Sequence, residues 1–445
     1  MSASKWKPYP NYKNTHSKWI GEIPSHWTIN KVKYLAEFVN GFAFDSNSFV
    51  DEGVPIIRIG DIAKSVNWEK TKKVPHEIAD STREYQLQLN DIVVALTGAT
   101  VGKSAIYQST KQALVNQRVA IIRTNDNIQQ QLLLYSIQSD YVMEQVKLLS
   151  YGGAQGNISH NDIAEIFIPL PPIEDQILVS KFIHNKIKII DQNIRDLEKT
   201  VLLLEEKRSA IITKAVTKGL KSDIPMKDSG VDWIGDIPEH WFCAKNLRLV
   251  DVKGRVGWHG LTTADYVDDG NYLLGASSIS ESGDFSLRRI KYVPDEIYER
   301  DKTIQVIDGD ILVVKVGATI GRSTVVRNLD RNATINAALF LVRPNQELYP
   351  EYFQYQLMSS HYRYQMDIQT AESAQGNLFK RDFVQMKTIV PPYAEQQEIA
   401  ERIEKELSII EDLITRITIQ IDKLKQYHDA VISAAVIGKI DVRSL

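Results

Sequence analysis

Residues 171–217 read PPIEDQILVSKFIHNKIKIIDQNIRDLEKTVLLLEEKRSAIITKAVT. After the two prolines, apolar residues recur at alternating steps of four and three, which is the seam of a heptad repeat. A helix from Ile173 to Thr217 would have roughly 45 residues and a length of about 65 Å, at about 1.5 Å per residue. The seam residues are Ile183, Ile187, Ile190, Ile194, Leu197, Val201, Leu204, Ile211 and Ala215.

A second seam follows Pro391 and Pro392, and its residues match those of the first seam one for one at a constant offset. Arg208 and His428 interrupt the two seams at the same position. They are candidates for setting the register of the helix pair or for contacting partner subunits, and we favour register. The second seam comprises Ile403, Leu407, Ile410, Ile414, Ile417, Ile421, Leu424, Val431 and Ala435.

An apolar stripe of this kind can also belong to a helix buried in a globular core. The length argues for pairing instead, because globular helices are rarely so long and a single apolar seam requires a partner. The first helix would leave one globular domain and end at the next, so the second must run back. We therefore predict an antiparallel two-helix coiled coil that separates two domains related by a pseudo-twofold axis.

The segments that flank the seams are also written twice. Four of them recur in the same order and at a nearly constant offset along the chain, so chance is a poor explanation. They are WIGEIPSHW (19–27) and WIGDIPEHW (233–241), NDIVVALTGATVGKS (90–104) and GDILVVKVGATIGRS (309–323), AQGN (154–157 and 374–377), and PLPPIEDQ (169–176) with IVPPYAEQ (389–396).

Each repeat begins with a region of short β-like runs and turns, for which we predict an α+β fold with a mixed, twisted sheet and short helices. Strands are expected at Asp91–Leu96, Ala113–Ile122, Asp310–Val316 and Ala333–Val342, and helices around Gln129–Ser150 and Tyr349–Ile368. The predicted domains are 1–170, the first long helix 171–220, a linker with the second domain 221–390, and the second long helix with its tail 391–445.

Composition leaves the choice of ligand open. The 445 residues include 53 Lys and Arg against 56 Asp and Glu, a net charge of −3, so no strong basic excess points to nucleic acid. No run of about 18 apolar residues predicts a membrane span. The polar start lacks a signal-peptide core, and the single cysteine, Cys243, cannot form an internal disulfide, so we expect a cytoplasmic protein.

Motifs that would indicate catalysis fail on spacing or on residue type. GATVGKS (98–104) has one residue too few for a phosphate-binding P-loop. Val390-Pro391-Pro392-Tyr393 lacks the Asn or Asp that begins the tetrapeptide of adenine methyltransferases, so the prolines are expected to rigidify the helix start. The nine histidines show no metal spacing, and His26 and His240 are expected to pack structurally. We predict no catalytic residue, no metal site and no cofactor in this chain.

Two domains held apart by a stalk suit a bipartite ligand, and half-sites on one face of DNA repeat about every 34–36 Å. The repeated motifs, together with the helix ending EEKRSAIITKAV (205–216), resemble those of Type I restriction–modification specificity subunits over nearly the whole chain. The resemblance implies two target-recognition domains that read an asymmetric double-stranded DNA site. It also implies two methyltransferase and two restriction subunits as partners, which use S-adenosylmethionine, ATP and magnesium. The alternative is a coiled-coil adaptor without DNA specificity.

Candidate DNA contacts are basic or polar residues in loops. Lys103 and Arg322 lie in the glycine turns, and the AQGN segments are shared by both domains, so their role is expected to be structural or toward the DNA backbone. Discrimination is expected where the repeats diverge, around 40–47, 64–73, 253–259 and 277–289. The candidates are Lys64, Lys103, Gln155, Asn157, Lys253, Arg255, Trp258, His259, Arg322, Gln375 and Asn377.

Overall fold

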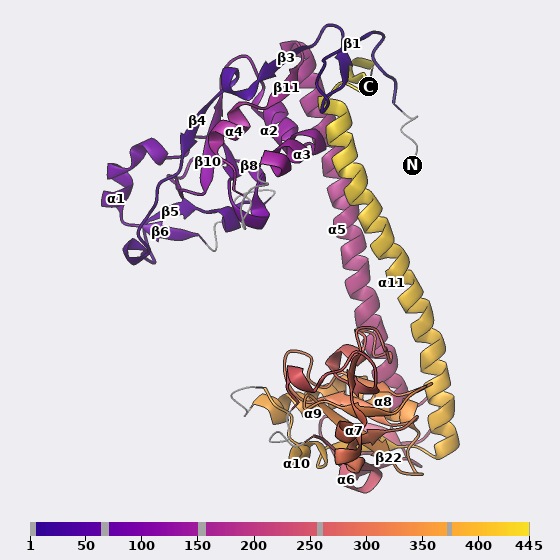
Figure 1. The fold of residues 1–445 in the computed structure, drawn as a ribbon. Coiled ribbons are helices and arrows are strands. Elements are labelled where there is room, and N and C mark those ends of the chain that lie inside the picture. Colours follow the sequence, from indigo (N-terminus) through magenta and orange to yellow (C-terminus); the bar gives the residue numbers. More distant parts are fainter. Residues whose placement is uncertain (1–5, 64–70, 150–156, 256–260, 372–375, 445) are drawn as a thin grey trace. The chain divides into compact units, whose positions relative to one another are not determined.

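The computed structural model describes residues 6–63, 71–149, 157–255, 261–371 and 376–444. The chain divides into two compact units, and each is considered by itself. The first unit consists of Met1–Glu198 with Ile419–Leu445, and the second of Lys199–Thr418. Each unit thus contains one α+β domain and a part of both long helices (Figure 1).

The two seams form two long helices. Helix α5 spans Ile173–Lys218 with 46 residues, and α11 spans Tyr393–Val436 with 44 residues. Each begins directly after a proline pair, where a missing amide hydrogen costs nothing. Each is followed by a glycine in the left-handed region, Gly219 at φ +75° and Gly438 at φ +73°. All predicted seam residues are buried or half-buried, whereas their neighbours along the middle of each helix are mostly exposed.

The start of each long helix packs beside the end of the other. In the first unit, Ile183 near the start of α5 shares a hydrophobic core with Ile432 near the end of α11. In the second unit, Ile212 near the end of α5 shares a core with Ile403 near the start of α11. The two helices therefore pair antiparallel, as the sequence predicts.

The first domain is built on two sheets. The larger has the order β4-β10-β7-β8 with antiparallel neighbours, and the smaller has the order β6-β5-β9 with β5 and β9 parallel. Helix α2 packs against β8 and β10 (Figure 1). The bounds are β4 Ala36–Asn40, β5 Val54–Ile57, β6 Lys72–Val74, β7 Ile92–Ala95, β8 Ser104–Ile106, β9 Leu114–Val115, β10 Val119–Thr124, α1 His76–Ser81, α2 Gln130–Gln138, α3 Asp140–Leu149 and α4 His160–Ala164.

The second domain repeats this plan. Its larger sheet has the order β15-β22-β19-β20, and its mixed sheet has the order β17-β16-β21-β18. The bounds are β15 Val250–Lys253, β16 Asn271–Leu274, β17 Lys291–Val293, β18 Gln305–Val306, β19 Ile311–Val314, β20 Ser323–Val325, β21 Ala333–Ile335, β22 Leu339–Pro344, α6 Asn246–Leu249, α7 Asp295–Arg300, α8 Pro350–Met358, α9 Ser360–Ala371 and α10 Lys380–Phe383.

Four small strand pairs complete the two units, and the repeated tryptophan and proline motifs overlap them. They are β1 (Tyr12–Asn14) with β2 (Glu22–Pro24), β3 (Thr28–Lys31) with β11 (Phe167–Leu170), β12 (Met226–Asp228) with β13 (Asp236–Pro238), and β14 (Phe242–Lys245) with β23 (Lys387–Val390). The predicted α+β class with mixed sheets is confirmed in both units.

Several predicted elements divide in two. The run Ala113–Ile122 forms β9 and β10, and Ala333–Val342 forms β21 and β22, with the members of each pair in different sheets. The helical region expected near 129–150 consists of two short helices that are divided at Ser139, whose ψ of 150° is extended and whose hydroxyl donates to Ser136 O at 2.5 Å. Ser359 breaks the second domain's helix in the same way, at ψ 155°. The strands predicted at 113–122 and 333–342 were therefore too long, whereas the short helices lie in the predicted ranges.

Candidate DNA interface and helix joints

A glycine turn joins two strands of the larger sheet in each domain. In the first domain, it lies between β7 and β8, with Gly98 at φ +70° and Gly102 at φ +80°. In the second, Gly317 and Gly321 have φ +90° and +82° between β19 and β20. A P-loop leads from a strand into a helix, whereas both turns lead into a second strand. The turns are therefore hairpin connections with a basic residue.

The AQGN segments meet these turns. Asn157 forms an isolated β-bridge with Thr97, and Ile158 N donates to Leu96 O at 2.9 Å. In the second domain, Asn377 bridges Val316 in the same way. Each domain thus brings its AQGN asparagine to the strand end that precedes the glycine turn. Gln155 and Gln375 lie outside the described residues.

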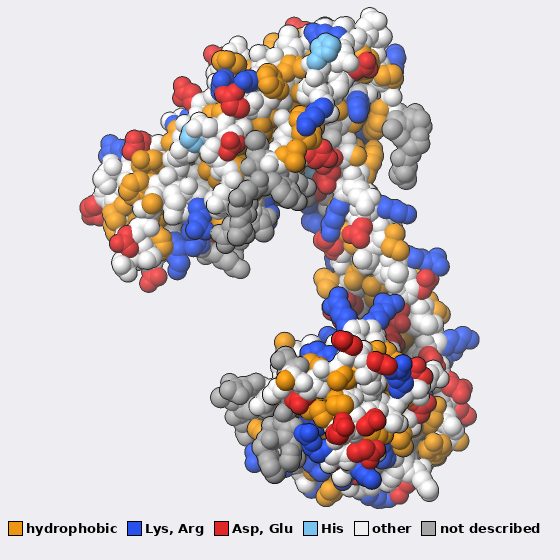
Figure 2. Space-filling model, in the orientation of Figure 1, with side chains coloured by type: hydrophobic (Ala, Val, Ile, Leu, Met, Phe, Trp, Pro, Cys, Tyr) orange, Lys and Arg blue, Asp and Glu red, His pale blue; other side chains and the backbone are white. Residues whose placement is uncertain are grey.

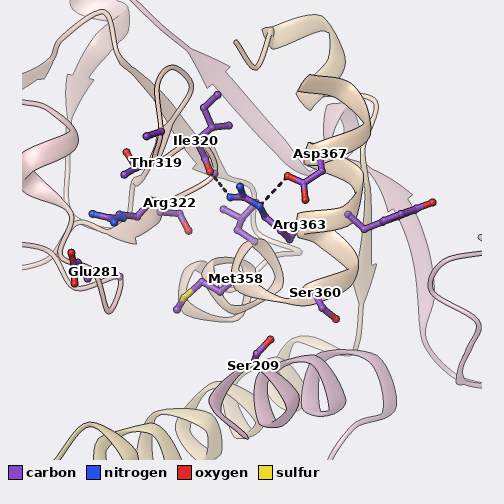
Figure 3. Close-up of a pocket in the computed structure, with 15 residues that line it drawn as sticks. Ser209, Glu281, Thr319, Ile320, Arg322, Met358, Ser360, Arg363 and Asp367 are labelled. Carbon is purple, nitrogen blue, oxygen red and sulfur yellow. Dashed lines mark hydrogen bonds and ion pairs between the residues drawn. The ribbon is translucent and has the colours of Figure 1, made fainter. Parts of the chain in front are cut away.

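The basic residues of the turns differ in exposure. Lys103 is exposed, and Arg322 is half-buried in a pocket of the second unit. Figure 3 shows this pocket, where Arg363 of α9 donates to Ile320 O at 2.6 Å and pairs with Asp367 at 3.1 Å. The pocket therefore has two guanidinium groups near the turn, one of which is neutralised by a carboxylate.

The candidate DNA contacts in the divergent segments 64–73 and 253–259 are only partly described. Lys64, Trp258 and His259 lie outside the described residues, and Lys253 ends β15 with its Nζ 3.2 Å from Asp251. Arg255 is 4 % exposed, and its guanidinium donates to Ile335 O at 3.0 Å and to Thr334 Oγ1 at 3.2 Å. Burial also lowers the pKa of Arg255. This placement differs from the expected exposed loop position, because acceptors on β21 hold the guanidinium inside the domain.

The repeated tryptophan motif has a role that the sequence did not reveal. His26 Nε2 lies 2.9 Å from Asp175 Oδ2, and Trp27 Nε1 donates to the same oxygen at 3.4 Å. Asp175 is in the first turn of α5, where a carboxylate is also favoured by the helix dipole. The end of the motif therefore holds the start of the long helix.

The second unit repeats the joint with a longer acid. His240 Nε2 lies 2.8 Å from Glu395 Oε2, and Trp241 Nε1 donates to that oxygen at 3.0 Å. Glu395 is in the first turn of α11, at the place in the repeat that Asp175 occupies on α5. The histidines are structural, as expected, but they act by hydrogen bonding to an acid rather than by packing alone.

A glutamine completes each joint. Gln176 Oε1 accepts from Gln129 N at 2.7 Å, and its Nε2 donates to Asn127 O and Pro171 O, both at 3.0 Å. The side chain is buried and fully used, which accounts for the repeat of Gln in PPIEDQ and PPYAEQ. The bonds of Gln396 are to Tyr349 N at 2.8 Å, Glu347 O at 2.8 Å and Pro391 O at 2.9 Å.

Each of these tryptophans bonds to the start of one long helix and also lies beside the end of the other long helix. A Cβ at Gly219, after α5, would lie 3.2 Å from the Trp241 ring, and one at Gly438, after α11, would lie 3.1 Å from the Trp27 ring. Each motif therefore joins the start of one long helix to the end of the other. This pairing explains why the motif and the proline-led helix start recur together.

The polar seam residues differ in their partners. Arg208 on α5 lies 3.6 Å from Glu411 on α11 and also donates to Ser282 O in the second domain. His428 Nδ1 lies 2.9 Å from Asp429, its neighbour on α11. Arg208 thus links both helices to a domain, which agrees with a role in register, and that role stays a prediction.

Over the residues that the structure describes, no group of three or more His, Cys, Asp or Glu is arranged to hold a metal ion. None of the helices in that part combines the length and the apolar character that a membrane crossing requires. On the face shown in Figure 2, basic and acidic side chains are interspersed over both units. DNA binding by such a surface would depend on individually placed residues.

The fold and its joints define a protein with two homologous α+β domains carried by paired long helices. The family model described as "Type I restriction modification DNA specificity domain" matches residues 24–200 and 266–423, which is most of the chain. The chain belongs to this family.

The similarity of the chain to its relatives in the family extends over most of their length. The chain is 24% identical to the Type I restriction enzyme EcoBI specificity subunit of Escherichia coli, with 94% of this chain and 87% of the relative covered. It is 20% identical to the EcoKI specificity subunit of E. coli strain K12, with 94% and 90% covered. A solved structure from work on assembly and conformational transition of the type I R-M system has a TM-score of 0.67 at 17% identity, and 94% of this chain and 99% of that one are covered.

Proposed function

We propose that this chain reads a bipartite, asymmetric DNA site and directs adenine methylation and restriction by partner subunits. The proposal rests on the observation that the two repeats share one backbone arrangement but carry different side chains at equivalent positions. On β4, Val39 pairs with Ile121, and on β15, Lys253 pairs with Leu341, the counterpart of Ile121 in the second repeat. Two domains with the same backbone arrangement but different side chains are suited to two DNA half-sites of different sequence.

The partners follow from the family and from the relatives, which are named specificity subunits of restriction enzymes. We infer two methyltransferase and two restriction subunits, which use S-adenosylmethionine, ATP and magnesium, in a complex on double-stranded DNA in the cytoplasm. The chain itself is proposed to be non-catalytic. Support comes from Val390, which is buried on β23 where a methyltransferase would need an Asn or Asp.

Methyl transfer measured with and without partners tests this proposal. The purified chain should transfer no methyl group from S-adenosylmethionine to DNA, and the chain with its methyltransferase subunits should methylate adenine in one split motif. Transfer by the chain alone would contradict the non-catalytic role. Assembly without salt-sensitive binding to duplex DNA would favour the adaptor instead.

A further inference from the structure

Lys315 follows the last residue of β19 and is a half-buried cation. Its Nζ lies 5.1 Å from the centroid of the Phe340 ring. No hydrogen-bond or ion-pair partner for this ammonium exists among the described residues. Burial lowers the pKa of Lys315, and no opposing acid raises it. A partly desolvated charge without a counter-ion is costly, so this position calls for an anion from outside the chain.

The surroundings of Lys315 are those of the candidate interface. Lys315 O accepts from Leu378 N at 2.8 Å, directly after the AQGN segment, and a Cβ on Gly254 would lie 3.3 Å from its Nζ. Lys315 thus stands at the sheet end where β15, the glycine turn and Asn377 meet.

The first domain has an apolar residue at the equivalent position. Leu96 is the counterpart of Lys315 in the repeated segment NDIVVALTGATVGKS. It is 6 % exposed and belongs to the hydrophobic core. Its backbone makes the same bonds, since Ile158 N donates to Leu96 O at 2.9 Å. The frame is therefore common to the two repeats, while the charge at this position is not.

The cation of the first domain lies in the turn before the neighbouring strand, β10. Leu96 N donates to Arg118 O at 2.9 Å, and Lys315 N donates to Ala338 O at 2.9 Å. Ala338 is the counterpart of Arg118 in the second repeat, so the two pairs are equivalent. Arg118 is exposed, and its guanidinium has no partner within the described part of the chain. Each domain thus has one unpaired cation at this pair of residues joined by a backbone hydrogen bond. The second residue of the pair, Arg118, carries the charge in the first domain, and the first residue, Lys315, carries it in the second.

We propose that Lys315 in the second domain and Arg118 in the first bind a phosphate of the DNA backbone at repeat-related positions. A phosphate is favoured over a base edge because an ammonium is a point charge and because the half-buried Lys315 has no counter-ion among the described residues. This inference rests on the proposed function and adds residues that set the position of each domain on its half-site.

The test uses the complex of the full chain with its methyltransferase subunits and two duplexes of equal length, with and without its methylation motif. Lys315→Leu copies Leu96 and should weaken binding to both duplexes by roughly ten-fold at moderate salt. The slope of log affinity against log salt should fall in magnitude by about one. Adding Ala338→Arg, which copies Arg118, should restore both values.

Two controls separate a contact from a structural role. Removal of a half-buried unpaired charge should leave the thermal midpoint of the free chain unchanged or higher, and Lys315→Met serves if Lys315→Leu does not fold. Leu96→Met should leave DNA binding unchanged.

Three outcomes would overturn the inference: an unchanged affinity and salt slope in Lys315→Leu, a lowered thermal midpoint in both variants, or a loss confined to the motif duplex. The last outcome would indicate a base contact. If the unsubstituted complex binds neither duplex, the proposed function itself fails.

Discussion

Trp241 Nε1 lies 3.0 Å from Glu395 Oε2, so the last residue of the repeated motif is bonded to the first turn of α11. Trp27 and Asp175 form the same pair at the start of α5. Because each tryptophan ring also lies close to the glycine that follows the other helix, the two joints hold both ends of both helices.

Glu395→Ala should destabilise the second unit by about 1–3 kcal/mol, because the buried Trp241 indole loses its acceptor. The free energy of unfolding in urea measures this effect. Glu398→Ala is the matched control, since Glu398 is exposed on the same helix and should have little effect. Equal free energies of unfolding for the two variants would show that the bond between Trp241 and Glu395 does not stabilise the second unit.

Ile190→Asp combined with Ile410→Asp should cost roughly 3 kcal/mol or more, because each residue is 4 % exposed and an aspartate there has no partner. Loss of helix pairing should also prevent assembly with methyltransferase subunits in gel filtration. The control is Ile189→Asp with Ile409→Asp, whose native residues are both 57 % exposed. Thermal unfolding should separate the two pairs, and similar midpoints would refute the seam.

We predict that the folded chain loses stability in acid because of His361. Burial lowers its pKa from 6.5 to about 4, and its ring nitrogens contact Ser359 Oγ at 2.9 Å and Gln356 Oε1 at 3.1 Å. The unfolded chain binds this proton more readily, so the free energy of unfolding should fall as the pH falls from 6.5 to about 4. His361→Gln should flatten this dependence, whereas an unaltered slope would assign the loss to other groups.

A fragment of residues 1–220 should form an antiparallel homodimer. The core of the first unit includes Ile432, Ala435 and Val436 of α11, which the fragment lacks. The end of α5 in a second copy carries Ile212, Ala215 and Val216 at the equivalent positions, and it can cover the exposed core. With methyltransferase subunits, the dimer should methylate a palindromic site. Sedimentation measures the dimer, and a folded, soluble monomer would argue against the helix pairing.

The first long helix could be predicted almost to the residue and the start of the second closely, because a heptad seam and a proline start are local signals. Sheet membership could not, since the polar turn at 116–118 marks a break within the run 113–122 but does not show that β9 and β10 join different sheets. The residues of the candidate DNA interface could not be predicted from the sequence either. Arg255 sits in a basic run, but its acceptors are about 80 residues away on β21, and Lys315 sits in an apolar strand run where no local signal marks its exposure. Only the comparison of Lys315 with Leu96 in the common frame reveals the change of charge.

The central claim is that this chain chooses the DNA sites at which its complex methylates adenine. Sequencing of the adenine methylation of host DNA, with the gene intact and with it deleted, tests this claim most directly. We predict that deletion removes one split motif whose two halves differ in sequence, and that the intact chain restores it. An unchanged set of methylated motifs after deletion would contradict the account.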